Sequence, residues 1–368
     1  MMGTSLWVAH WLKWIPAYPG QVHAEAMMGG FFLTVAFGFL MTAIPKFTGT
    51  KSATGLEKGI LFFLVVSLLI SSLLSARFFF HLIVLLEIIF VARFGLPRFL
   101  RAAFHPAPSF ILVGLGLFSA FFGDLLFLFH DIGWLSPSFF VFAKGLFFYG
   151  MFLGLVLGVG TQLIPSIIGL GRQSLGQVQS PTPLNRPAFD QKAIARFGLY
   201  GLILFASFVL ESFWDIFWGR FVRALLVTFV VLFHWRIYQT PKAKGILVWC
   251  LWLSAWMLVL GVWPGVLFSA YAVHEAHILF IGSVSLMIFG VMTRVTLAHG
   301  EHDRTPELKS RGLFLLLAFL LTALLTRLLS PFVLNYYSHL AYASLFWILA
   351  ALCWMVTFMP KVIKGKNG

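Results

Sequence analysis

Apolar stretches long enough to cross a bilayer follow one another along the whole chain, separated by short polar segments. A transmembrane helix needs roughly 17 to 25 such residues, and it satisfies its own backbone hydrogen bonds in hydrocarbon. The pattern therefore predicts an all-α, polytopic bundle. The eleven expected spans lie at about 22–45, 58–76, 78–94, 108–130, 139–167, 194–213, 217–238, 245–268, 273–298, 311–330 and 338–359, with a tight reversal around Arg77 between the second and third.

Positive charge is concentrated in every second loop. Because Lys and Arg favour the cytoplasmic side of a membrane protein, this alternation predicts an outer N-terminus and a cytoplasmic C-terminus. Twenty of the 26 basic residues lie on the predicted cytoplasmic side: Lys46, Lys51, Lys58, Arg93, Arg98, Arg101, Arg172, Arg186, Lys192, Arg196, Arg236, Lys242, Lys244, Arg294, Arg304, Lys309, Arg311, Lys361, Lys364 and Lys366.

Polar segments also predict how the chain is organised. Residues 1–21 carry Trp at helical spacing, which is typical of a short helix at the outer, periplasmic interface. The only long polar stretch, 169–193, predicts a cytoplasmic linker between a five-helix half, 22–168, and a six-helix half, 194–360. A basic cytoplasmic tail, 361–368, follows.

Composition agrees with a membrane protein, since 60% of the residues are hydrophobic and only 10% are charged. Soluble domains carry about a quarter charged residues. A net charge of +14 would indicate nucleic acid as the partner of a soluble protein. Here the basic residues belong to the loops, so we expect a lipid bilayer as partner and no nucleic acid. Cys250 and Cys353 lie in apolar stretches and predict no disulfide.

Three histidines stand at the predicted outer ends of spans: His23 opens the first, and His274 and His277 open the ninth. The latter two are three residues apart and share a helix face. Neutral imidazole suits copper, iron and zinc, and Met27 would add a thioether donor. The pattern favours a metal or haem-iron site in the outer leaflet. The alternative is that these side chains bind water among the lipid headgroups.

Ionisable residues also occur inside the spans. Glu87, Asp124 and Lys144 lie within the third, fourth and fifth, with His81 and His130 nearer the outer ends of the third and fourth. A bare charge in the membrane costs about 3 kcal/mol or more, so each needs a partner or water. One interpretation is a proton or ligand path descending from the outer site. The other is a structural pair such as Lys144 with Asp124, and a protonated Glu87.

The inner end of the ninth span carries Arg294 and His299. Snorkelling to the interface explains such an arginine. A second interpretation is an anion clamp, for example on a haem propionate, with an iron ligand from His299, His302 or His234. Two depths for a metal centre therefore remain open.

The first and ninth spans resemble one another. A constant offset superimposes His23 on His274, Met41 on Met292 and Gly49 on Gly300. The fifth span ends "GTQLIPSIIG", which is similar to the "MTAIPKFTG" exit of the first. This spacing fits pseudo-repeats of four-helix units, and repeats of this kind place sites at their interfaces.

The segments "HAEAMMGGFFLTVAFGFLMTAIPKFTG" and "HILFIGSVSLMIFGVMTRVTLAHG" resemble the most recognisable parts of the NnrS family. That resemblance implies a bacterial inner-membrane protein with haem and copper, linked to nitric oxide stress and denitrification. The family's markers fall here on His23, Met27, Pro45, Thr48, Gly49, His277, Gly282, Met292, Arg294 and His299.

The chain departs from the family pattern at both segments. Members usually show His-x-His-Glu-Met where this chain has "HAEAM", so Glu25 would substitute as an oxygen ligand. The usual closing Gly-His-Thr-Gly-Arg is replaced by residues 298–302, "AHGEH". Family members usually have twelve spans. These departures predict a divergent branch with an altered metal site, and they leave open the loss of one metal.

Two functions follow. The first is a haem- and/or copper-binding membrane protein that binds or processes nitric oxide, with His23 and His277 as ligands and His274 as ligand or orienting residue. The second is a proton-coupled transporter without a redox cofactor, which uses Glu87, Asp124 and Lys144. The residue spacing does not decide whether the protein is an enzyme.

Overall fold

The computed structural model describes residues 2–103, 106–171, 190–300 and 302–364. Within these residues, eleven helical segments are long and apolar enough to cross a membrane. They are Gly20–Thr48, Gly55–Leu73, Arg77–Leu100, Phe110–Asp131, Pro137–Ile167, Gln191–Phe213, Ile216–His234, Ile246–Leu267, Ala272–His299, Arg311–Phe332 and Tyr336–Ile363. The predicted spans are confirmed, and the chain is a multi-pass membrane protein.

The reversal around Arg77 is confirmed as well. Ser75 has a φ of 54°, a left-handed conformation, and the chain turns there between two spans. The sidedness of the two termini stays a prediction, and so do the predicted halves, N-terminal interfacial segment and tail. Most of the predicted linker, residues 172–189, lies outside the described residues.

The chain splits into two compact units. Unit 1 comprises Met1–Ala24, Ile164–Gly171 and Val227–Gly368, and unit 2 comprises Glu25–Leu163 and Arg172–Leu226. Each unit has its own buried side chains, and each is described by itself below.

The helices of unit 1 include the last four spans, from Ile246–Leu267 to Tyr336–Ile363. They are α1 (Met2–Trp11), most of α2 (Gly20–Glu25), η4 (Val230–His234), α11 (Ile246–Val262), α12 (Pro264–Leu267), η5 (Ser269–Tyr271), α13 (Ala272–His277), η6 (Ile278–Ser285), α14 (Leu286–His299), α15 (Thr305–Lys309), α16 (Arg311–Leu329), η7 (Ser330–Phe332) and α17 (Tyr336–Lys364).

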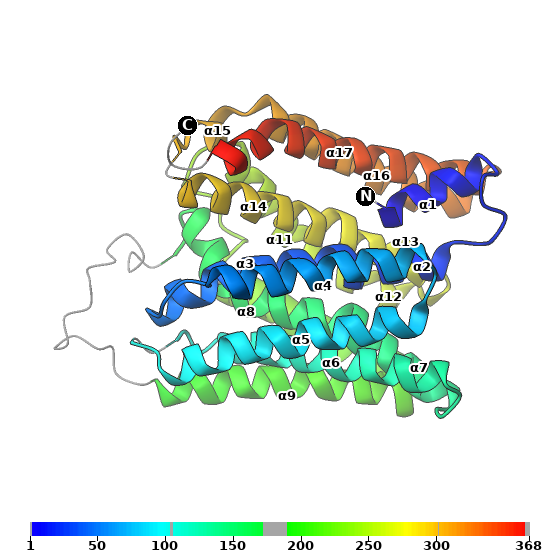
Figure 1. The fold of residues 1–368 in the computed structure, drawn as a ribbon, viewed down its shortest axis with the longest axis horizontal. Coiled ribbons are helices and arrows are strands. Elements are labelled where there is room, and N and C mark those ends of the chain that lie inside the picture. Colours follow the sequence, from blue (N-terminus) through cyan, green and yellow to red (C-terminus); the bar gives the residue numbers. More distant parts are fainter. Residues whose placement is uncertain (1, 104–105, 172–189, 301, 365–368) are drawn as a thin grey trace. The chain divides into compact units, whose positions relative to one another are not determined.

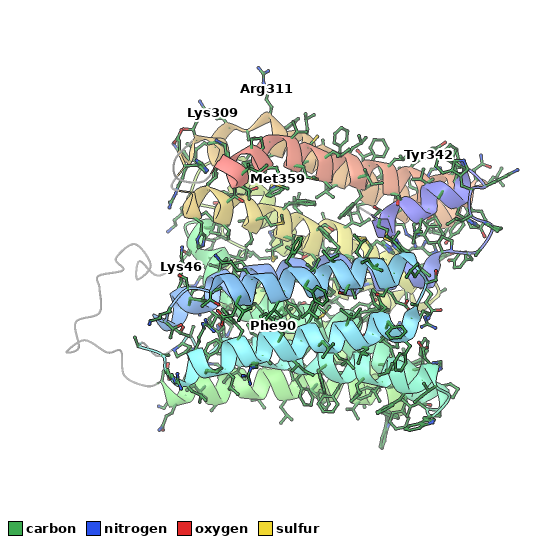
Figure 2. All side chains as sticks on the ribbon, in the orientation of Figure 1. Lys46, Phe90, Lys309, Arg311, Tyr342 and Met359 are labelled. Carbon is green, nitrogen blue, oxygen red and sulfur yellow. The ribbon has the colours of Figure 1, made fainter. Side chains whose placement is uncertain are left out.

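Helix α17 organises unit 1. It packs along α16 as a helical hairpin, and α1 lies against it (Figure 1). The Trp347 indole donates to the Ser285 hydroxyl (3.1 Å), and the Trp354 indole donates to the Thr293 hydroxyl (2.9 Å). These bonds satisfy buried polar groups and fix α17 against the ninth span. Within this unit, Figure 2 shows Lys309 and Tyr342 at opposite ends of the α16–α17 hairpin.

The helices of unit 2 pack as a second bundle. They are η1 (Ala26–Leu33), α3 (Thr34–Thr48), α4 (Gly55–Leu73), α5 (Arg77–Leu100), α6 (Phe110–Asp131), α7 (Pro137–Lys144), η2 (Gly145–Gly150), most of α8 (Met151–Ile167), α9 (Gln191–Phe213) and most of α10 (Ile216–Phe229).

Glycines bring α6 and α8 into close contact. A Cβ on Gly154 would lie 2.6 Å from the Cα of Gly116, and a Cβ on Gly158 would lie 2.8 Å from the backbone nitrogen of Val113. Transmembrane helices lack a hydrophobic driving force for association, so small residues at four-residue spacing allow the backbone approach that holds them together.

Gly154→Ala is therefore expected to push α6 and α8 apart and to destabilise the protein by about 1–3 kcal/mol, the usual cost of overpacking. Thermal unfolding of the purified protein in detergent measures this loss. Gly114→Ala is the matched control, because Gly114 also lies on α6 but has open space around its missing Cβ. Equal melting temperatures for the two variants would contradict the close-packing account.

The first and ninth spans share an unusual backbone pattern. In each, a short α-helix leads into an eight-residue π-helical segment, η1 or η6, and then into a second α-helix. The fifth span has a shorter π-helical segment, η2, and η4 ends the seventh. Such segments are rare and frequently occur at functional sites. The similarity of these two spans therefore extends to the backbone, while the four-helix repeat stays a prediction.

Candidate functional site

His23 and His277 lie close together in unit 1. His23 is on α2, and His277 is the last residue of α13, where the π-helical segment η6 begins. The two imidazoles are near enough to interact electrostatically. The edge of Trp7, from α1, contacts His23 with ring centroids 5.7 Å apart. Helices α1 and α2, at the start of the chain, therefore meet the distant α13 around this pair.

Backbone carbonyls orient both rings. His23 Nδ1 lies 2.7 Å from the Gly3 carbonyl oxygen, and His277 Nδ1 lies 2.8 Å from that of Val273. A carbonyl oxygen only accepts, so Nδ1 is the protonated nitrogen of each neutral ring. The lone pair of each Nε2 is then available. Metal-bound histidines usually donate their second ring N–H in this way.

His274 is held differently. Its Nδ1 accepts a hydrogen bond from Arg327 Nη1 (2.5 Å), because a guanidinium can only donate. Its Nε2 therefore carries the proton in the neutral ring. Of the two roles predicted for His274, the geometry favours the orienting residue over the ligand.

The remaining predicted ligands belong to unit 2. The Glu25 carboxylate accepts from Arg77 Nη2 (2.9 Å), and Met27 is buried in η1. Among the described residues, no group of three or more His, Cys, Asp or Glu side chains is arranged to hold a metal. The imidazole pair of unit 1 keeps both Nε2 atoms unprotonated, and its role as a metal ligand set stays a prediction. Two neutral imidazoles match the chemistry of copper and of haem iron.

At the other end of the ninth span, Arg294 is paired. Its Nη1 donates to the Glu307 carboxylate, so its charge already has a partner within unit 1. His299 is exposed at the end of α14. The neighbouring His302 Nε2 lies 2.8 Å from the Lys361 carbonyl oxygen. The anion clamp on a haem propionate stays a prediction.

Unit 2 brings together five polar side chains on α5, α6 and the end of α2. His81 Nδ1 lies 2.7 Å from Asp124 Oδ1, and both residues are fully buried. Arg77 bridges Glu25 and Asp131, at 2.9 and 3.2 Å. His81 Nε2 stands 4.0 Å from each of these two carboxylates. Three carboxylates thus surround one imidazole.

Of the other predicted path residues, His130 reaches the edge of this cluster, with Nδ1 4.0 Å from Asp131 Oδ1, whereas Glu87 and Lys144 do not join it. Glu87 is fully buried, with no hydrogen-bond partner for either oxygen among the described residues. Lys144 has its ammonium nitrogen 5.8 Å from the Phe140 ring, and His130 packs on the same ring at 4.5 Å. The structural pair of Lys144 with Asp124 is therefore not formed, because His81 takes the carboxylate.

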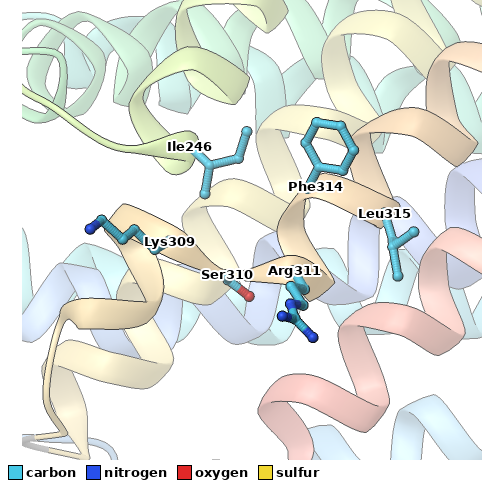
Figure 3. Close-up of a pocket in the computed structure, with 6 residues that line it drawn as sticks. All are labelled: Ile246, Lys309, Ser310, Arg311, Phe314 and Leu315. Atoms are coloured by element: carbon cyan, nitrogen blue, oxygen red, sulfur yellow. The ribbon is translucent and has the colours of Figure 1, made fainter.

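A shallow apolar hollow in unit 1 lies away from these polar groups. Figure 3 shows its lining beside Ile246, Ser310 and Phe314, with Lys309 and Arg311 at its edge. Its location at the Lys309 end of the α16–α17 hairpin separates it from the histidine pair.

A comparison with protein-family models shows the family of this chain. The model of the NnrS protein family matches residues 1–365, almost the whole chain. The chain belongs to the NnrS family. No curated protein and no solved structure matches it. Membership makes the chain a nitric-oxide-related membrane protein at the level of the family, which is associated with metal and haem in general.

Sequence reasoning missed Arg327, Arg77 and Asp131. Arg77 was used only to place a turn, although it forms two ion pairs. Arg327 lies near the predicted outer end of its span, on the side with few basic residues. That exception to the charge alternation was the available signal.

Proposed function

We propose that this member of the NnrS family binds haem and/or copper in a bacterial inner membrane and binds or processes nitric oxide there. The observation that carries the proposal is the imidazole pair, His23 and His277, each with Nδ1 bonded to a backbone carbonyl. A bound metal with an open coordination position would supply the site for a diatomic gas.

The chain's own residues prepare the site. The Gly3 and Val273 carbonyls select the tautomer that leaves Nε2 unprotonated. Trp7, which is buried, covers one side of His23 and limits the movement of its ring. His274, held by Arg327, presents an N–H donor beside the pair. Nitric oxide partitions into lipid, so no aqueous channel is needed.

The test is the absorption spectrum of the purified full-length protein after expression with added haem and copper, combined with metal analysis. The proposal expects a Soret band, stoichiometric copper, or both. Preparations that remain colourless and metal-free under these conditions would contradict it.

That outcome would favour the second function, a proton-coupled transporter without a redox cofactor. Its specific support is the buried His81–Asp124 pair, with two further carboxylates 4.0 Å from His81 Nε2. Such intramembrane ionisable groups are rare and commonly carry protons. Proteoliposomes then report on it: a pH gradient should drive uptake of the transported solute, and Asp124→Asn should abolish that coupling.

A further inference from the structure

We infer that Arg327 of unit 1 forms, with His274 and Tyr336, a binding site for a carboxylate or a small planar oxyanion. The inference goes beyond the proposed function, because it stands whether or not a metal is bound to the neighbouring histidines. Its starting point is a buried cation whose surroundings contain hydrogen-bonding groups but no negative charge.

The two buried arginines of the described chain differ in this respect. Arg223 and Arg327 are each 7% exposed. Arg223 lies 2.5 Å from the Glu211 carboxylate, which is its counter-ion. No described carboxylate lies within 4.0 Å of Arg327, whereas Arg77, Arg98, Arg220 and Arg294 each have at least one. A buried, unpaired charge is costly, so proteins pair such groups or use them to bind ions.

The groups around Arg327 are suited to holding an anion. Nη1 donates to His274 Nδ1 and to Ser330 Oγ (3.1 Å), which fixes the plane of the guanidinium. The phenols of Tyr336 and Tyr18 lie near enough to interact with it electrostatically. A guanidinium has five N–H donors in a fork that matches two oxygens of a planar anion. His274, with its proton on Nε2, adds a further donor.

Tyr18 does not supply the missing charge. Partial burial, and after it the neighbouring Tyr336 phenol, raise the pKa of Tyr18 above its ordinary value of 10.0. It is therefore a neutral phenol at physiological pH. An external anion is needed to neutralise Arg327.

Two sources share this chemistry. One is a haem propionate, which would make Arg327 part of the cofactor site and rests on the proposed function. The other is a free anion of the nitrite or formate type. Arg327 interacts electrostatically with both His23 and His277, so either anion would lie beside the imidazole pair. A fixed positive charge there would also offset the negative charge of an anionic metal ligand.

The test uses full-length protein prepared without haem and copper, with sodium formate as the probe. Formate is expected to raise the melting temperature by a few degrees over sodium chloride at equal ionic strength, as expected for a ligand that binds only the folded state. Arg327→Gln should abolish the shift, and Tyr336→Phe should weaken apparent formate affinity about tenfold. No formate-dependent shift in the wild-type protein would overturn the inference.

Two further experiments separate a binding role of Arg327 from a structural one and identify the source of the anion. Without formate, Arg327→Gln should melt at or above the wild-type temperature, since it removes an unpaired charge, whereas Arg223→Gln should melt well below it. Equal destabilisation would mean that Arg327 is a structural residue and would overturn the site. If haem loading of the wild-type protein removes the formate effect, and if Arg327→Gln loses haem, the anion is a haem propionate. Persistence of the formate effect identifies a free anion. If the protein binds no haem, the formate test on the haem-free protein still decides the inference.

Discussion

His277→Ala is expected to remove the metal centre of unit 1, with metal affinity falling more than about 100-fold. Loss of a residue that only orients a ligand already costs about 10- to 100-fold. Here the ligand itself would be lost, and no third His, Cys, Asp or Glu among the described residues is arranged to replace it. His23→Ala should have the same effect. Metal content and absorbance after purification in identical detergent give the measurement.

Substitutions of two other histidines test whether the loss of metal is specific to His23 and His277. His274→Ala should cost only about tenfold, because its Nδ1 is engaged with Arg327 and is not free to bind the metal. His130→Ala should retain full metal content, since that ring packs on Phe140 in unit 2. A His277→Ala protein that keeps its metal, or one that loses it no more than His130→Ala does, would contradict the assignment.

Glu211→Gln is expected to destabilise unit 2 by about 3–5 kcal/mol, the usual effect of breaking a buried ion pair from one side. The Glu211 carboxylate accepts from Arg220 (2.8 Å) and Arg223 (2.5 Å). The substitution would leave the buried Arg223 guanidinium without its carboxylate partner and would remove one ion pair from Arg220. Chemical denaturation of the purified protein measures the loss.

The matched control is Glu57→Gln, which breaks a more exposed pair with Arg98. Water screens that interaction, and a glutamine can still accept the Thr54 N–H hydrogen bond of the capping box, so the expected cost is about 1 kcal/mol or less. Similar losses at the two positions would show that burial does not determine the strength of these pairs.

Hydropathy was sufficient for the spans because the bilayer sets their length. Each predicted span coincides with an observed helix to within a few residues, and the short "SSLLSARFFFH" segment was enough to predict a turn. Hydropathy does not predict how the spans pack against one another. The close approach of Gly116 and Gly154 and the π-helical segments depend on contacts between distant residues.

Part of the candidate site followed from the sequence for the same reason. His23, His274 and His277 stand at span ends of the same predicted depth, and the structure places all three in unit 1. The hydrogen bonds of His23 and His274 were not predictable, because Gly3 and Arg327 belong to other helices, whereas His277 bonds to Val273 one turn earlier on its own helix.

The hydrogen-bond partner of Asp124 could not be predicted from the sequence. The sequence offered Lys144 as the nearest opposite charge. The antiparallel hairpin of α5 and α6 instead brings His81 to the depth of Asp124, where its Nδ1 lies 2.7 Å from the buried carboxylate. Charge alone was a poor guide where helix pairing fixed the contact.

The most direct measurement of the central claim is a count of the imidazoles bound to the metal. Pulsed electron paramagnetic resonance on copper(II)-loaded protein with ¹⁵N-labelled histidine detects the remote, protonated nitrogen of each bound ring. The account predicts two imidazoles in the wild-type protein and one in either His23→Ala or His277→Ala at saturating copper. Two imidazoles that persist in both variants and disappear in His299→Ala would place the metal at the opposite end of the ninth span and contradict it.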